Sequence, residues 1–223
     1  MFKVIRSYPE PSDLKKSIYN SPEIVKELCK IFHGKCYLCE QGDLSDPEVE
    51  HFTPHEGNNI LKFQWENLFY SCSRCNSIKG TRKDLLLNCT DKSVNVSNEI
   101  IHLAGRCIYN GVEIKASSDT PSEETLNTIN LLTDCYNSVN TGIRGITKEN
   151  LMEKIQEHYV YFMNLRMDLV NKKNTDREIN NIIEKLEVLC TPSYPFSIFW
   201  KWHILTDNRI QSLLKTKGMK INF

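Results

Sequence analysis

The sequence predicts an α+β fold in which helices predominate. Apolar residues recur at helical spacing in several stretches after Thr120. Two short extended stretches, 47–52 and 68–70, lie between two Cys-x-x-Cys pairs. At 223 residues the chain is long enough for one compact body. We expect three parts packed together: an N-terminal arm and helix (1–34), a cysteine-bearing module (35–90), and a hairpin followed by a helical region (91–223).

The N-terminal part is predicted to be an irregular arm followed by one helix. Pro9 and Pro11 favour an irregular arm, with a short helix around 14–19. Ser21, Pro22 and Glu23 supply an N-cap, a proline at the first helical position and an early acid. An apolar stripe follows, and Gly34 ends it. This helix leads the chain directly into the first cysteine pair.

The C-terminal part is predicted to be a hairpin and then helices. Residues 100–116 resemble a hairpin with Asn110-Gly111 at its turn. Thr120-Pro121 is expected to cap a helix that carries Leu126, Ile129 and Leu132. Three further helices are expected, one from Thr147, one around 179–189, and a last one from about Phe196 that includes Trp200 and Trp202.

The charge balance gives no global attraction to an anionic partner. Lys and Arg number 28, as do Asp and Glu, so the formal net charge is zero. Any contact with nucleic acid must therefore come from a local patch. We find neither a charged-then-apolar leader nor an apolar run of the roughly 18 residues that span a bilayer. We therefore expect a cytoplasmic protein without a membrane partner.

The nine cysteines include two pairs with metal-ligand spacing, Cys36/Cys39 and Cys72/Cys75. Each Cys-x-x-Cys turn places two sulfurs on one side of an ion, so two turns complete the tetrahedral shell of a structural zinc. The alternative is four small buried apolar side chains. A thioredoxin-like redox pair is disfavoured because neither pair opens a helix within a βαβ pattern. The remaining cysteines are expected to be free and mostly buried thiols: Cys29, Cys89, Cys107, Cys135 and Cys190.

The segment around the second pair carries a recognisable motif. EVEHFTP (48–54) precedes WENLFYSCSRCNSIKG (65–80). An acid directly before a histidine, an asparagine ahead of a second strand, and Cys-x-x-Cys-Asn-x-x-Lys entering a helix together resemble the HNH endonucleases of the ββα-metal superfamily. This resemblance implies a zinc-stapled ββα module that hydrolyses phosphodiester bonds.

The chemistry of that reaction suits the residues of the motif. His51 fits a general base because histidine titrates near neutral pH. Glu50 and Asn76 can offer oxygen ligands to Mg²⁺ or Mn²⁺. The resemblance implies that Glu50 and Asn76 hold the catalytic metal and that Asn67 orients the histidine ring. The acid in this family is usually aspartate, and the glutamate here is one methylene longer.

Each of these residues also has a structural interpretation. His51 could be a hydrogen-bonded core histidine, Asn67 a turn residue and Asn76 a helix cap. His55 could be a further ligand, a phosphate contact or simply a solvated loop residue, and the same alternatives apply to Glu56. The order of Glu50, His51, Asn67 and Asn76 within one short segment matches that of the family, which favours the catalytic interpretation.

A local basic patch follows the motif. Residues 71–83 contain four cations and no acid: Arg74, Lys79, Arg82 and Lys83. We expect them to contact the phosphate backbone of nucleic acid. A solvated run of charge is the alternative.

The flanking sequence narrows the resemblance. HGKCYLCE, EVEHFTP, the 65–80 segment and PFSIFWKW in the helical tail are similar to the PtuB-type HNH nucleases of Septu and retron-associated anti-phage systems. These nucleases act with an ATPase, PtuA, so the resemblance implies such a partner here. The chain has no Gly-x-x-x-x-Gly-Lys-Ser/Thr loop, and nucleotide sensing is therefore expected to lie in another subunit.

Three functions are compatible with these patterns. The first is a metal-dependent endonuclease, with DNA favoured as substrate. The second is a non-catalytic zinc module that binds nucleic acid or a partner ATPase. The third is the same chemistry directed at RNA, such as tRNA. The Glu50-His51 pair with Asn76 favours an enzyme, because a scaffold requires only the cysteines.

Overall fold

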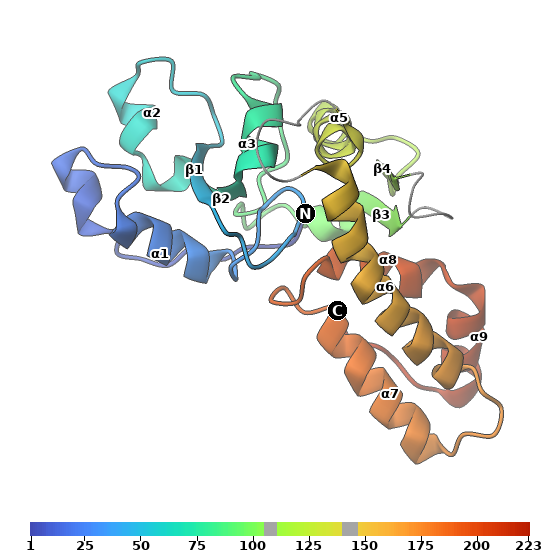
Figure 1. The fold of residues 1–223 in the computed structure, drawn as a ribbon. Helices are drawn as coiled ribbons and strands as arrows, with labels where there is room; N and C mark the ends of the chain where they lie inside the picture. The colour runs from blue at the N-terminus through green and yellow to red at the C-terminus, as the bar shows by residue number, and fades with distance from the viewer. Residues whose placement is uncertain (105–110, 140–146) are drawn as a thin grey trace.

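The structure is a computed structural model that describes residues 1–104, 111–139 and 147–223. Within these ranges helices make up most of the regular structure, and the strands form two small sheets of two strands each. This confirms the predicted α+β class. Figure 1 shows the N-terminal half gathered around β1, β2 and α3, with helices α6 to α9 extending away from it. None of the described helices combines the length and apolar character needed to cross a bilayer.

The N-terminal arm leads into helix α1. A 3₁₀ turn, η1 (Ser12–Lys16), precedes α1 (Pro22–Ile31), and the Ser21 side chain accepts a hydrogen bond from the backbone N–H of Ile24. This is the predicted cap. Helix α1 buries Ile24, Leu28 and Ile31 and packs against β2.

The central module is a hairpin followed by a helix. Strand β1 (Pro47–His51) pairs antiparallel with β2 (Leu68–Cys72), and α3 (Ser73–Lys79) contacts both strands. Between the strands lie α2 (Asn59–Phe63) and the 3₁₀ turn η2 (Trp65–Asn67). The sequence predicted only a loop at 57–59. Instead the Asn58 side chain caps α2 by accepting hydrogen bonds from the N–H groups of Ile60 and Leu61.

A second hairpin and helix α5 come next. Helix α4 (Val96–Glu99) leads into β3 (Ile100–Ala104), which pairs with β4 (Val112–Ala116). The Asn110 part of the expected turn lies outside the described residues. Helix α5 (Glu123–Asn137) is capped by Ser122 rather than by the expected Thr120. Leu126 is 48 % exposed, because the buried face of α5 is set by Leu131, Leu132, Cys135 and Tyr136.

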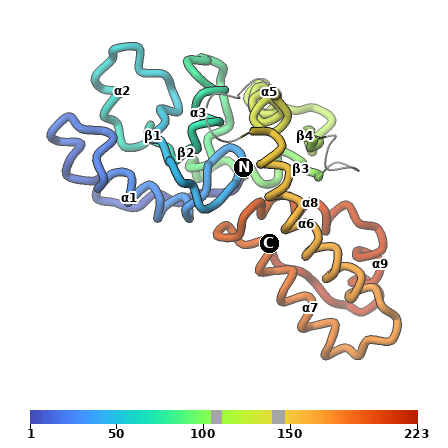
Figure 2. Tube along the Cα trace, in the orientation of Figure 1, coloured from blue at the N-terminus to red at the C-terminus, as the bar shows by residue number. Residues whose placement is uncertain are grey.

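Four helices form the C-terminal region: α6 (Lys148–Leu169), α7 (Asp176–Leu189), α8 (Ser197–Thr206) and α9 (Asn208–Lys217). Helix α6 packs along α7, α7 contacts α8, and α8 packs on β3, as the trace in Figure 2 allows the reader to follow. The sequence predicted one last helix. It is divided at Asp207, which ends α8 and whose side chain caps α9.

The C-terminal part of the chain (91–223) also forms hydrogen bonds with the first cysteine turn, Cys36 to Cys39, and with residues next to it. The Tyr136 hydroxyl of α5 donates to the Cys39 carbonyl at 2.9 Å. Lys35, which is fully buried, donates to the Tyr194 carbonyl at 2.8 Å and pairs with Glu40 at 3.4 Å. Glu40 in turn accepts from the Ser197 hydroxyl at 3.0 Å. The cysteine-bearing module and the C-terminal helices are therefore joined by buried polar contacts.

Candidate active site and metal centre

The four cysteines of the two pairs meet in one buried cluster. The sulfurs of Cys36, Cys39, Cys72 and Cys75 all lie within 4.8 Å of one another. Tetrahedral zinc with Zn–S bonds of about 2.3 Å sets neighbouring sulfurs about 3.8 Å apart. The Cys39 and Cys72 sulfurs are 3.8 Å apart. The donor set and its burial therefore fit a metal such as zinc.

The cluster joins two distant segments of the chain. Cys36 and Cys39 lie in the turn after α1, whereas Cys72 ends β2 and Cys75 lies in the first turn of α3. The Cys72 sulfur also caps α3, because it accepts the N–H of Cys75 at 3.4 Å. Cys29, Cys89, Cys135 and Cys190 are free and lie outside the four-sulfur cluster, and Cys107 falls outside the described residues.

His51 ends β1 with its ring in a half-buried setting. Its Nε2 lies 3.1 Å from the Lys62 carbonyl, so Nε2 carries the proton and donates. The Nδ1 nitrogen is then the basic one. Burial lowers the pKa of His51, and the positive charges of Lys79 and Lys62 add to this, against the hydrogen bond to the carbonyl. The imidazole is therefore neutral at pH 7, the form that a general base requires.

Asn67 fixes the loop next to His51. Its side-chain nitrogen donates to the carbonyls of Thr53 and Leu61, each at 2.9 Å, and its oxygen accepts the Thr53 N–H at 2.7 Å. Leu61 directly precedes Lys62, whose carbonyl receives the His51 hydrogen bond. Asn67 would therefore influence the orientation of the His51 ring indirectly, by fixing the backbone of the loop.

Glu50 lies on the face of β1 that is turned toward α3 and is 3 % exposed. Its Oε1 pairs with the Lys79 ammonium at 2.6 Å, and its Oε2 accepts from the Tyr37 hydroxyl at 2.8 Å. Burial raises the pKa of the Glu50 carboxyl, while Lys79 and Tyr37 act in the opposite direction. Lys79 thus has a buried protein partner, which differs from the expected phosphate contact.

Asn76 also meets an acid of β1, but a different one. Its Nδ2 donates to Glu48, which shares a strand face with Glu50 because side chains alternate along a strand. The Asn76 Oδ1 has no hydrogen-bond partner among the described residues. Carboxylate and amide oxygens are the ligands that Mg²⁺ prefers. The Asn76 Oδ1 is open to such a ligand role, whereas both oxygens of Glu50 already contact Lys79 and Tyr37.

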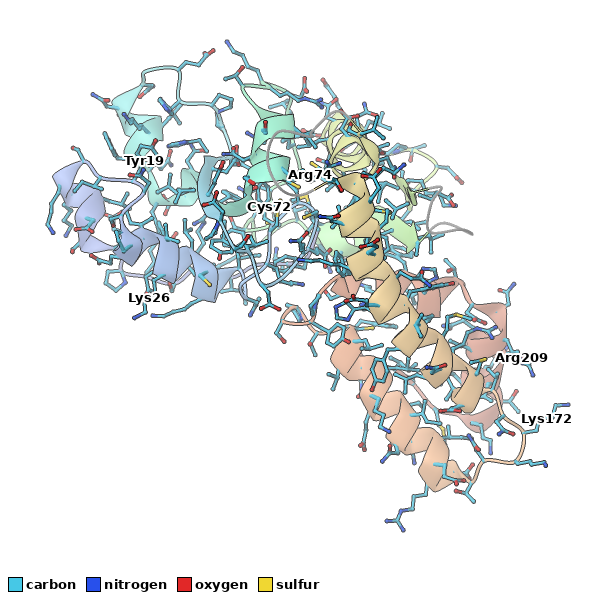
Figure 3. The ribbon with its side chains drawn as sticks, in the orientation of Figure 1. Tyr19, Lys26, Cys72, Arg74, Lys172 and Arg209 are labelled. Carbon is cyan, nitrogen blue, oxygen red and sulfur yellow. The ribbon has the colours of Figure 1, made fainter. Side chains whose placement is uncertain are left out.

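The predicted basic patch is largely engaged within the protein. Arg74 is 1 % exposed and donates to the carbonyls of Cys135 at 3.1 Å and Ser138 at 2.6 Å, near the end of α5. Figure 3 shows Arg74 between α3 and the α5–α6 side of the molecule. Its expected phosphate contact needs correction, because these buried carbonyls take its donors. Arg82 pairs with Asp134, and Lys83 pairs with Glu56, both near the surface.

Four residues that sequence reasoning missed or left open also lie here. Glu48 and Tyr37 contact Asn76 and Glu50, and the period of two along β1 was the signal that could have indicated Glu48. The His55 ring lies edge-to-face with His51, with ring centres 4.7 Å apart. Tyr19, labelled in Figure 3, packs on His51 from the N-terminal arm at 4.9 Å.

Comparison with known proteins supports the predicted resemblance to PtuB. No family model matches the chain. A Septu protein PtuB of Bacillus thuringiensis is 32 % identical over 108 residues, which cover 46 % of this chain and 40 % of that protein. The chain resembles the Septu protein PtuB. A second PtuB, of Bacillus mycoides, is 36 % identical over 73 residues, covering 26 % of this chain and 25 % of that protein. The matches thus span less than half of either PtuB.

The cysteine cluster predicts that metal and stability are lost together. Cys72→Ser should lower both the zinc content of freshly purified protein and its melting temperature, because structural zinc contributes folding free energy. Elemental analysis and thermal unfolding measure the two effects. Cys29→Ser is the matched control and should keep the metal. Wild-type protein free of zinc would contradict the assignment.

The buried pair predicts a large cost when Lys79 is removed alone. Lys79→Met leaves the Glu50 carboxylate buried and unpaired, which typically costs about 3–5 kcal/mol of unfolding free energy. Lys83→Met, at an exposed pair, should cost less than about 1 kcal/mol. The double variant Glu50→Gln/Lys79→Met should recover much of the loss. Urea denaturation gives all three values, and equal losses for the two single variants would refute the buried-pair account.

Proposed function

We propose that the chain is a metal-dependent HNH endonuclease that hydrolyses phosphodiester bonds of nucleic acid, with DNA favoured. The observation that supports this most directly is the state of His51, whose Nε2 donates to the Lys62 carbonyl so that Nδ1 remains as a base. This base ends a strand paired in a hairpin, with α3 packed on the hairpin and a four-cysteine cluster at the strand-to-helix corner.

His51 would act by taking the proton of the attacking water at Nδ1. The imidazolium that forms is stabilised by the Lys62 carbonyl, which already accepts the Nε2 proton at 3.1 Å. Asn67 holds the loop that carries this carbonyl, so the ring keeps its orientation during proton transfer. General-base catalysis of this kind typically contributes about 10²–10⁴-fold.

Glu50 and Asn76 would hold the catalytic Mg²⁺ or Mn²⁺. Such an ion, when bound, stabilises the charge that develops on the scissile phosphate. Glu48 acts as a positioning residue, because it accepts the Nδ2 protons of Asn76 and leaves Oδ1 as the ligand atom. Lys79 and Tyr37 are the positioning residues for Glu50, because each contacts one of its carboxylate oxygens.

We further propose that the enzyme is the effector subunit of a cytoplasmic Septu-type anti-phage system. The similarity to two Septu PtuB proteins supports this, and the absence of a phosphate-binding Gly-x-x-x-x-Gly-Lys-Ser/Thr loop from the sequence fits a separate PtuA-like ATPase subunit. Co-purification with the product of the neighbouring gene tests the partner. A chain that is fully active alone would argue against it.

The decisive test of the activity is His51→Ala. With Mg²⁺ or Mn²⁺, wild-type protein should cut plasmid or phage DNA, and the variant should lose about 10²–10⁴-fold in rate with unchanged zinc content. His158→Gln, a half-buried histidine of α6, is the control and should remain active. Wild-type cleavage of total RNA alone would redirect the proposal to an RNase. Full activity of His51→Ala would place the active site elsewhere.

The lowered pKa of His51 also fixes the direction of the pH dependence. The base is neutral above its pKa, so kcat/KM should be flat near pH 7 and fall only as the pH drops below the ordinary histidine value of about 6.5. Rates measured at saturating Mn²⁺ separate this titration from metal binding. An acid limb centred above pH 6.5 would contradict a neutral, half-buried base.

A further inference from the structure

The cations that the sequence assigned to phosphate contacts have other roles in this structure. Arg74 and Lys79 are buried and bonded to protein acceptors, and Arg82 and Lys83 pair with carboxylates. A nuclease still needs a donor beside its base, because the scissile phosphate must lie within reach of the water that the base activates. His51 itself cannot be that donor, since Nε2 is bonded to Lys62 and Nδ1 is the base.

His55 has the geometry that this role requires. It lies in the loop after β1, half-buried, with its ring centre 4.7 Å from that of His51. Its Nδ1 accepts the N–H of Gly57 at 3.1 Å, so the neutral ring carries its proton on Nε2. This Nε2–H has no hydrogen-bond partner among the described residues. The ring that carries this unpaired donor therefore packs directly against the ring of the proposed base.

The His55 ring belongs to an aromatic cluster with His51 and Tyr19, on which the Lys62 side chain packs. The Lys62 ammonium lies over the Tyr19 ring, 5.6 Å from its centre, and Tyr19 packs on His51. The nearest acid along the loop, Glu56, is paired with Lys83 at 2.7 Å. The loop itself is fixed by Asn67. A free N–H donor whose neighbouring acid is already paired thus suits a phosphate oxygen.

We propose that His55 binds the nucleic-acid backbone, donating its Nε2–H to a phosphate oxygen next to the bond that the water activated by His51 attacks. This rests on the proposed nuclease function. It makes His55 a substrate-binding residue of the site and distinguishes it from a ring that merely packs against His51. The two roles make opposite predictions for substitutions that keep either the ring or the donor.

Two substitutions at His55 separate these roles. His55→Phe keeps an aromatic ring against His51 but removes the donor, whereas His55→Lys removes the ring and restores a cationic donor. Binding is measured without added Mg²⁺ or Mn²⁺, so that no cleavage occurs, and without a chelator, which would remove the structural zinc. The readout is fluorescence anisotropy of a labelled DNA duplex and of RNA of the same sequence. His158→Phe serves as the control far from the site.

If His55 contacts phosphate, His55→Phe should weaken binding by about 10- to 100-fold, as expected for a hydrogen bond to a charged group, and His55→Lys should recover most of it. Wild-type affinity for His55→Phe together with a loss for His55→Lys would overturn the proposal in favour of packing. Wild-type protein that binds but never cuts would refute the nuclease and leave the contact standing. Protein that binds neither DNA nor RNA would refute both.

Discussion

The cysteine cluster is the constraint on which the rest of the site depends. Neither hairpin strand is longer than five residues, and an isolated two-stranded hairpin of this size is marginal in water. The four sulfurs tie the end of β2 and the start of α3 to the turn after α1. This connection fixes how α3 packs against the hairpin, and this packing brings one face of β1 into contact with α3.

The face of β1 toward α3 is organised by polar contacts rather than by apolar packing. Two carboxylates lie two residues apart on this face of the strand, and each contacts one residue of α3. Glu48 contacts Asn76, and Glu50 contacts Lys79. A buried carboxylate is costly without a partner, so Lys79 is required for Glu50 to remain charged. Lys79 therefore supports the site, where the sequence suggested contact with substrate.

Short-range patterns in the sequence predicted the cysteine cluster and the first helix. Two Cys-x-x-Cys turns were enough to predict the cluster, and an N-cap, a proline and an apolar stripe were enough for α1. The sequence could not indicate which cations are buried, because Arg74 donates to carbonyls that lie some sixty residues away along the chain. The register of α5 was also misjudged, since Thr125 and Thr128 are buried where Leu126 was expected. The division at Asp207 was missed because an aspartate cap within a helical pattern looks like an ordinary polar position.

The engagement of Arg74 has a consequence for how the molecule can be divided. Its guanidinium binds carbonyls near the C-terminal end of α5, where a helix leaves acceptors unpaired and carries partial negative charge. The same helix supplies the Tyr136 hydroxyl to the Cys39 carbonyl. A fragment that ended near residue 90 would leave a buried cation and a cysteine turn without these partners. Residues 35–90 therefore do not form an independent unit, and a chimera that transplants them must include α5.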